Sequence, residues 1–436
     1  MHYIPNILFA ILLIVGIGFF AKNVKKLIRN IKLGKAVDRS DNSSLRLKNM
    51  INIALGQSKM VKRPISGLLH IIVYVGFIII NIEVLEIIID GLFGTHRVFS
   101  SLGGFYGILI GTFEILAFLV FISVIIFWIR RMIIRIPRFW NKEMGGFPKN
   151  DALYILYFEM VLMSLFLIMN ATDAHFQLAD SGNIISQFIA PLFSGFDADT
   201  LHYIERIAWW VHIAGILVFL NYLYYSKHLH ILLAFPNTYF ANLNPKGKFS
   251  NLQSVTDEVK MMLDPSIDPY ATPVGFESTD ETVPEKFGAE DVFDLNWVQL
   301  MNAYTCTECG RCTSVCPANI TGKELSPRAI MMKTRDRIEE VGKNIDKNGK
   351  FVADENSLFT SISNEELWAC TSCNSCVEEC PINIDPLSII VDMRRFLVME
   401  KSAAPQELNT MMANIENNGA PWQYNQLDRL NWKDEK

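Results

Sequence analysis

Two short stretches of sequence decide the fold of the C-terminal part: residues 306–317 read CTECGRCTSVCP, and residues 370–381 read CTSCNSCVEECP. In each stretch, three cysteines are separated by two residues, a fourth follows after three more, and a proline comes next. All eight cysteines of the chain lie in these two runs. Cysteines clustered in this way are typical of metal sites in a reducing compartment and not of a disulfide framework. We therefore expect this part of the chain to lie in the cytoplasm.

The shared spacing is that of bacterial two-cluster ferredoxins, in which three thiolates of a run hold one 4Fe–4S cluster and the fourth binds the other cluster. It predicts two clusters with crossed ligands. The predicted ligands of cluster one are Cys306, Cys309, Cys312 and Cys380, and those of cluster two are Cys370, Cys373, Cys376 and Cys316. Four thiolates also suit tetrahedral zinc, but two identical runs that each end in proline favour iron–sulfur clusters.

The cysteine-rich domain is expected to span residues 286–400 and to be helical. The two runs are separated by 53 residues, many more than a compact ferredoxin needs, and helix-like stretches occur around residues 327–341 and 364–369. Pro327 followed by Arg328 suits the first turn of a helix. These features favour an α-helical ferredoxin domain over the compact form that contains β-strands.

The part of the chain before about residue 235 is much more apolar than the rest. A spanning helix needs about 20 mainly apolar residues to cross a hydrocarbon core roughly 30 Å thick. Five segments meet this requirement: residues 4–21, 65–89, 104–129, 151–171 and 207–233. The predicted fold class is therefore all-α. It consists of a five-helix transmembrane bundle (1–235), a linker (236–285), the cysteine-rich domain and a C-terminal tail (401–436).

Charges in the loops predict the orientation, because Lys and Arg are retained on the cytoplasmic side of a membrane. Residues 22–63 carry twelve basic side chains and residues 130–149 carry six. In contrast, residues 90–103 contain only Arg97, and residues 171–205 contain neither Lys nor Arg. This pattern places the N-terminus outside the cell and the cysteine-rich domain in the cytoplasm, with the chain in the cytoplasmic membrane.

Histidines inside spanning segments are candidate ligands, since polar residues in a membrane are costly. His70 and His230 lie at matching depths near the cytoplasmic side, and neutral imidazoles bind haem iron well, so we expect a haem b between them. His212 and His230, eighteen residues apart, are expected on one face of the fifth helix. A second haem on His212 would need another ligand, for instance His175. The alternative is that His228 and His230 only lie among lipid headgroups.

The stretch CTECGRCTSVCPANITGKELSPRAI, with LWACTSCNSCVEECPINIDPLSIIVDMRR, resembles the cysteine-rich domain of heterodisulfide reductase C and anaerobic glycerol-3-phosphate dehydrogenase C. The membrane part is similar in plan to the haem b-binding γ subunit of respiratory nitrate reductase, which implies haem b on His70 and His230. It departs from that pattern at Ile80, where the γ subunit has a second helix-two histidine. Chains that fuse both parts usually continue into cysteine-rich CCG domains, which implies a CCG-type heterodisulfide reductase-like partner here.

Two carboxylates are expected deep in the apolar segments. Glu114 and Glu159 should lie roughly 12–15 Å from the membrane surface, and we interpret them as candidates for proton handling at a quinone site or, equally, as packed hydrogen-bond partners. Glu83 and Glu86 lie near a membrane edge and are expected to reach water.

No dinucleotide-binding loop, P-loop or hydrolase pattern occurs, and the net charge of −5 argues against a nucleic-acid partner. We predict an electron-transfer subunit that connects menaquinone, haem b and the two clusters to a cytoplasmic partner. Alternatives are a redox-responsive sensor or scaffold, and a tethered ferredoxin without haem. Trp422, Tyr424 and Trp432 suggest that the tail binds the partner, unless they fold back onto the cysteine-rich domain.

Overall fold

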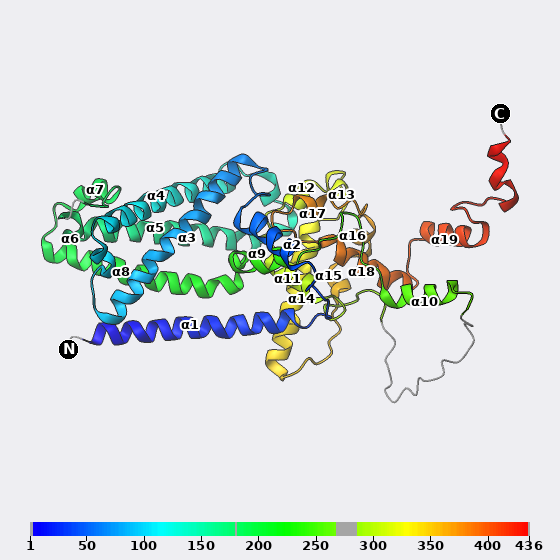
Figure 1. Cartoon of the computed structure of the whole chain (residues 1–436), viewed down its shortest axis with the longest axis horizontal. Coiled ribbons are helices and arrows are strands. Elements are labelled where there is room, and N and C mark those ends of the chain that lie inside the picture. Colours follow the sequence, from blue (N-terminus) through cyan, green and yellow to red (C-terminus); the bar gives the residue numbers. More distant parts are fainter. Residues whose placement is uncertain (1–2, 179–180, 267–285, 435–436) are drawn as a thin grey trace.

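The computed structural model describes residues 3–178, 181–266 and 286–434. Within these ranges the regular elements are all helical, and the backbone makes only one isolated bridge, between Lys35 and Asn296. The predicted all-α class is confirmed. Figure 1 shows a bundle of long helices at one end of the molecule, a compact group of shorter helices beside it, and a C-terminal segment that projects away.

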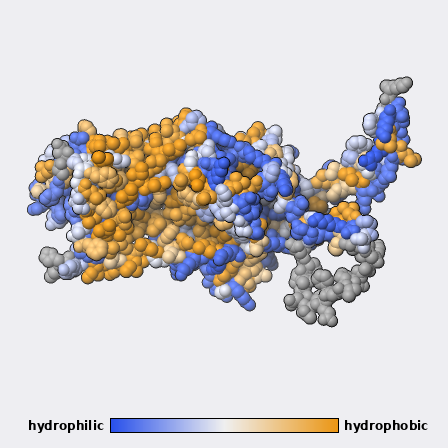
Figure 2. Space-filling model, viewed as in Figure 1, coloured by the Kyte–Doolittle hydropathy of each residue, from blue (hydrophilic) through white to orange (hydrophobic). Residues whose placement is uncertain are grey.

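Five helices are long and apolar enough to cross a membrane, as predicted, and the chain is a multi-pass membrane protein. They are α1 (Ile4–Ile31), α3 (Pro64–Phe93), α4 (Gly104–Met132), α5 (Phe147–Thr172) and α8 (Ala198–Tyr222). α4 packs between α3 and α5, α5 packs against α8, and α1 covers α3 and α8. Their outer faces form the continuous apolar surface in Figure 2, as expected where lipid replaces water.

The fifth segment differs from the expectation. A single helix over residues 207–233 was predicted, but α8 ends at Tyr222, two short turns follow around Ser226, and α9 (His230–Tyr239) starts afresh. Ser226 is extended, its hydroxyl accepts the His228 amide at 2.9 Å, and Asp151 accepts the Lys227 amide at 3.0 Å. Because these side chains satisfy the amides that a continuous helix would use, the helix breaks here. The prediction that His212 and His230 share one helix face is therefore wrong.

The cysteine-rich domain is built from short helices around one long helix. In order they are α11 (Trp297–Thr305), α12 (Arg311–Ser314), α13 (Pro317–Ile320), α14 (Pro327–Asn348), α15 (Leu358–Ser361), α16 (Asn364–Trp368), α17 (Ser375–Glu379) and α18 (Pro386–Met399). Side-chain caps start several of them. Asn296 and Gln299 form a capping box at α11, and Ser326 caps α14 with Pro327 in its first turn.

This domain packs directly on one end of the membrane bundle, and the two share a continuous core. Leu27 of α1, Ala54 and Ala234 are buried together with Leu300 and Ile330 of the cysteine-rich domain. The short α2 (Ser43–Met50) and α9 fill the layer between them. Both basic loops contact the domain. The Lys59 ammonium donates to the Cys380 carbonyl at 3.0 Å, and the Arg328 guanidinium donates to the Arg138 carbonyl at 2.7 Å.

The opposite end of the bundle carries the N-terminus and the connection between α5 and α8, which includes α6 (Ala174–Leu178) and α7 (Ser186–Ile189) (Figure 1). Of the predicted linker, residues 267–285 lie outside the described residues, and α10 (Gln253–Leu263) forms in the remainder. In the tail, α19 (Gln406–Asn418) and residues 426–433 project from the domain. Trp422 and Trp432 are 61% and 68% exposed, so the described tail does not fold back onto the clusters.

Candidate functional site

The two cysteine runs adopt the same backbone shape. After α11, the first run turns through positive φ at Glu308 (52°) and Gly310 (71°) before α12 begins. At the same two places in the second run, Ser372 (56°) and Asn374 (60°) have positive φ before α17 begins. Glycine and asparagine tolerate this region best, which explains why they occupy the second of the two positions. In each run, the turns bring the first three cysteines close together. The fourth cysteine follows a short helix, α12 in the first run and α17 in the second.

Packing of α12 against α17 brings the runs together around one cavity. The thiol-bearing residues that line it are Cys306, Cys309, Cys312, Cys376 and Cys380. Met331, Ile382 and Ile384 close the cavity with apolar side chains. Burial raises the pKa of Cys306 to about 12 and that of Cys380 to about 11, with neighbouring thiols adding to the effect. A dry cavity with several convergent thiols suits a metal cluster, because metal binding drives off the thiol protons.

The remaining cysteines gather at a second place. Cys376 is near enough to Cys370 and Cys316 for their charges to raise its pKa, after burial as the main cause, and Cys316 has the same effect on Cys370. Cys373 is exposed, whereas Cys306, Cys316 and Cys380 are buried. Cys373 of the second group is thus the one exposed thiol among the eight cysteines, all of which the structure describes.

Two of the predicted haem ligands face one another. The ring centroids of His70, in the first turns of α3, and His230, at the start of α9, are 6.4 Å apart with an interplanar angle of 39°. Nδ1 of His230 lies 3.1 Å from the Lys227 carbonyl, which leaves its Nε2 free. His228 lies beside His230, but its ring also packs edge-on against Phe219 at 5.4 Å.

The rings of the second candidate pair, His212 and His175, do not face each other as those of His70 and His230 do. His212 is 2% exposed and its ring packs against Phe166, with centroids 6.2 Å apart. The ring of His175 lies 6.5 Å from that of His96 instead, beyond the end of α5. Among the described residues, His212 and His175 make no ring contact with each other.

The two candidate carboxylates have different surroundings. Glu114 is fully buried and both of its oxygens are used: one accepts from Asn170 at 3.0 Å, and the other from the amides of Ile185 and Ser186 at 2.7 and 3.0 Å. It therefore anchors the segment that leads into α7. Glu159 is partly buried and its carboxylate lies 3.8 Å from Nε2 of His228.

Arg311, which was not predicted from the sequence, links the first cysteine run to the start of α3. It follows Gly310 in the first run and donates to the carbonyls of Lys59 and Met60, at 3.1 and 3.3 Å, immediately before α3. Its side chain also lines the cavity between the two cysteine runs. No local signal identifies it, because its neighbours come from segments about 250 positions away in the sequence.

Comparison with known proteins agrees with the cysteine geometry. Residues 305–384 match the family described as the 4Fe-4S dicluster domain. The match includes all eight cysteines, so the cysteine-rich domain is similar to a dicluster domain. No solved structure matches the chain significantly.

Two relatives match almost the whole chain, both the membrane bundle and the dicluster domain. A probable iron-sulfur-binding oxidoreductase, FadF, from Bacillus subtilis is 30% identical over 98% of this chain and 61% of its own length. An EtfAB:quinone oxidoreductase from Syntrophomonas wolfei is 23% identical over 92% of this chain and 55% of its own length. A heterodisulfide reductase C-like protein from Archaeoglobus profundus is 28% identical over 28% of this chain and 53% of its own length. The chain thus spans little more than half of the relatives it matches, and it is similar to iron–sulfur oxidoreductases.

Proposed function

We propose that this chain is the membrane electron-transfer subunit of an iron–sulfur oxidoreductase, in which electrons pass between membrane quinone, haem b and two 4Fe–4S clusters. The observation that carries the proposal is the facing pair of His70 and His230 next to the dicluster domain. Consider two imidazoles that bind the same metal atom from opposite sides, each through a ring nitrogen about 2 Å from the metal. Their ring centroids would be about 6.3 Å apart. The observed 6.4 Å fits this arrangement.

The hydrogen bond of His230 supports the same role. A ligating imidazole usually donates its second N–H to a carbonyl or carboxylate, which fixes the tautomer and orients the ring. The Lys227 carbonyl is in the right place to accept from Nδ1 of His230. A bound haem would supply a one-electron change at its iron, and His70 and His230 would hold it through one imidazole nitrogen each.

The histidine pair and the first group of cysteines share one protein interior. Leu229 and Ala234, on either side of His230 in sequence, belong to the same buried core as Cys306 and Cys380. Arg311 lines the cysteine cavity and donates to the carbonyls of Lys59 and Met60, just before the helix that carries His70. These shared contacts support electron transfer from one centre to the other.

The crossed ligand assignment gives this path an order. Cluster one, on Cys306, Cys309, Cys312 and Cys380, is buried beside the bundle. Cluster two, on Cys370, Cys373, Cys376 and Cys316, includes the exposed Cys373. Cluster two is therefore the exit toward a partner protein.

We propose that this partner is a CCG-type protein like those of heterodisulfide reductases, on the cytoplasmic side. Relatives of the dicluster domain include the C subunits of heterodisulfide reductases, which by name are parts of larger assemblies. The exposed residues Met411, Met412, Trp422 and Trp432 of the tail offer apolar anchors for it. Affinity purification of the chain, intact or cut after Lys401, tests this. Equal recovery of a partner with both forms would contradict a role for the tail.

For the quinone we assign proton handling to Glu159, because its carboxylate is beside His228 near the proposed haem. Glu114, whose oxygens are both occupied, is better explained as a structural anchor. A relative whose printed name is a quinone oxidoreductase is consistent with this choice.

Two measurements on the purified chain test the function. A reduced-minus-oxidised optical spectrum should show a b-type haem, and addition of a menaquinol analogue should change the redox state of haem and clusters together. A sensor or scaffold would show haem and clusters but no coupled response to quinol. A tethered ferredoxin would show clusters without haem, and either result would overturn the proposal.

A further inference from the structure

A polar cavity lies at the end of the bundle opposite the clusters, where the proposed function uses no residue. It is enclosed by α3, the loop before α4, the end of α5 and α8. Its charged lining comprises the carboxylates Glu83, Glu86, Asp90, Asp173 and Glu205, the guanidinium groups Arg97 and Arg206, and the imidazole His96. Five carboxylates therefore face two permanent cations.

Most of these carboxylates are held in place by donors that suit their ionised form. Asp90 accepts the amides of Arg97 and Val98 at 2.7 and 3.1 Å, and Glu86 accepts the Phe99 amide at 2.8 Å. These bonds bind the loop to α3. They do not supply any further positive charge, so an excess of negative charge remains inside the cavity.

One buried carboxylate in the lining, that of Glu83, has an oxygen without a hydrogen-bond partner among the described residues. Glu83 is 3% exposed, and its Oε2 is buried with no hydrogen-bond partner among the described residues. It does not reach water, contrary to the expectation from its position near a membrane edge. Buried polar atoms without partners are rare in native proteins and point to an absent water, ion or ligand.

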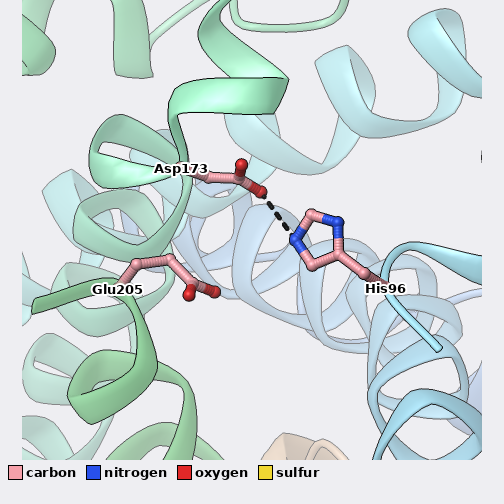
Figure 3. Close-up of side chains that lie close together, drawn as sticks. All are labelled: His96, Asp173 and Glu205. Carbon is pink, nitrogen blue, oxygen red and sulfur yellow. Dashed lines mark ion pairs between the residues drawn. The ribbon is translucent and has the colours of Figure 1, made fainter. Parts of the chain in front are cut away.

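Three side chains converge on one point in this cavity. Figure 3 shows His96, Asp173 and Glu205 turned toward one another from three separate segments. One potential ligand atom from each lies within 4.8 Å of the others. Asp173 and Glu205 are each 4% exposed, whereas the His96 side chain is 47% exposed. The place where the three side chains meet is therefore accessible to solvent beside His96.

We propose that His96, Asp173 and Glu205 bind a divalent transition-metal ion of the zinc or manganese type. One imidazole nitrogen and two carboxylate oxygens are a donor set that these ions accept, with open positions for water. The metal reduces the excess negative charge that the arginines leave. Arg97 donates to Asp173 at 2.7 Å and His96 lies 3.2 Å from the same oxygen, whereas Arg206 donates to both oxygens of Glu205. The metal therefore shares these carboxylate oxygens with the guanidinium groups and replaces the His96–Asp173 contact.

The metal fastens the α3–α4 loop, the end of α5 and the start of α8 to one another. Ile87, Met169 and Trp209, which also line the cavity, already belong to an apolar core shared by α3, α5 and α8, so the metal adds to that packing. The site is independent of the electron-transfer proposal, because none of its residues is a predicted haem or cluster ligand.

The test uses the full chain, purified in detergent through a tag without histidine and treated with a chelator. It is then equilibrated with micromolar Zn²⁺ or, separately, Mn²⁺, and bound metal is counted by mass spectrometry relative to iron. We expect about one equivalent of one of these ions. His96→Ala and Glu205→Gln should each weaken binding by at least about tenfold. His202→Ala, an exposed histidine on α8 at the same end, should leave it unchanged.

Iron content and the cluster signals of each variant verify that it is folded. If metal is lost in both site variants while iron is retained, the site is established. Zinc that persists in His96→Ala would belong to the cysteines and would overturn the proposal, as would the absence of both metals from the wild-type chain. A rise in unfolding temperature with the bound ion, absent in His96→Ala, is the second expected readout.

Discussion

The Lys227 ammonium, in the turn that breaks the fifth membrane segment, pairs with the Glu308 carboxylate, which stands between Cys306 and Cys309. Both side chains are buried, with exposed fractions of 9% and 2%. Arg335 of α14 reaches the other carboxylate oxygen at 2.9 Å, and the Lys227 ammonium also donates to the Pro148 carbonyl at 2.5 Å. The backbone loop that carries two cluster ligands is thus fastened directly to the membrane bundle.

Lys227→Met should destabilise the protein, because it leaves the buried Glu308 with a single partner. Breaking a buried ion pair costs about 3–5 kcal/mol, and the remaining Arg335 places this change near the low end. The unfolding temperature in detergent should fall, and the first cluster should be lost before the second. The double variant Lys227→Met, Glu308→Gln should recover part of the loss.

The matched control for this pair is Lys62→Met. Lys62 pairs with Glu378 at 2.8 Å, but both side chains are well exposed, so the loss should be within about 1 kcal/mol. Equal effects of Lys62→Met and Lys227→Met would mean that burial of the Lys227 pair has no energetic consequence.

The crossed ligand assignment predicts which cluster each fourth cysteine serves. Cys380→Ser should alter the cluster held by Cys306, Cys309 and Cys312, because Cys380 lines the same cavity. Cys316→Ser should alter the cluster of the second run. Electron paramagnetic resonance of the two reduced variants distinguishes the clusters, and damage in each case to the cluster of the variant's own run would exclude the crossing.

The haem proposal predicts different results for three neighbouring histidines. His70→Ala and His230→Ala should each abolish a low-spin b-type absorbance. His228→Ala should retain it, because the His228 ring packs against Phe219 and lies to one side of the facing pair. Loss of the spectrum in His228→Ala with retention in His230→Ala would reverse the assignment. His212→Ala is expected to leave a single haem intact.

Gly310→Ala should disrupt the first cysteine run. Its φ of +71° is strained for alanine, and an added Cβ would come within 2.5 Å of the Arg328 guanidinium. Arg328 cannot move away easily, because it is fully buried and pairs with Glu143 at 2.6 Å. The expected result is a lower unfolding temperature together with loss of iron from the first cluster.

Gly349→Ala is a control for Gly310→Ala, because it introduces backbone strain without a steric clash. Gly349 ends α14 with a φ of +76° and has nothing within 4 Å of an added Cβ, so only the backbone strain of about 1 kcal/mol applies. If Gly310→Ala were no more harmful than Gly349→Ala, the contact with Arg328 would not restrict this turn.

Features that depend on local spacing could be predicted from the sequence. The five spanning helices follow from uninterrupted apolar length, since lipid leaves the backbone no other partners. The four-cysteine runs contain glycine or asparagine at the second of their two positions with positive φ. The helical class of the dicluster domain was expected from the length between its cysteine runs and from Pro327, which lies in the first turn of α14.

Features that depend on contacts between segments far apart in the chain could not be predicted from the sequence. The break at Ser226 requires Asp151 from α5 to accept the Lys227 amide, and Asp151 lies 76 positions away in the sequence. In the same way, Glu114 appeared as a candidate for chemistry until the amides of Ile185 and Ser186 were found to occupy it.

The amino-acid sequence by itself thus indicated that five segments are long and apolar enough to cross a membrane, and it predicted which thiols hold the clusters, because both depend on the chemistry of near neighbours in the chain. Only the tertiary structure decided that His230 starts a new helix facing His70, that Lys227 fastens the first cysteine run to the bundle, and that His96 meets Asp173 and Glu205. The physical reason is that each of these contacts joins segments from different helices, and their positions are set by packing of the whole molecule.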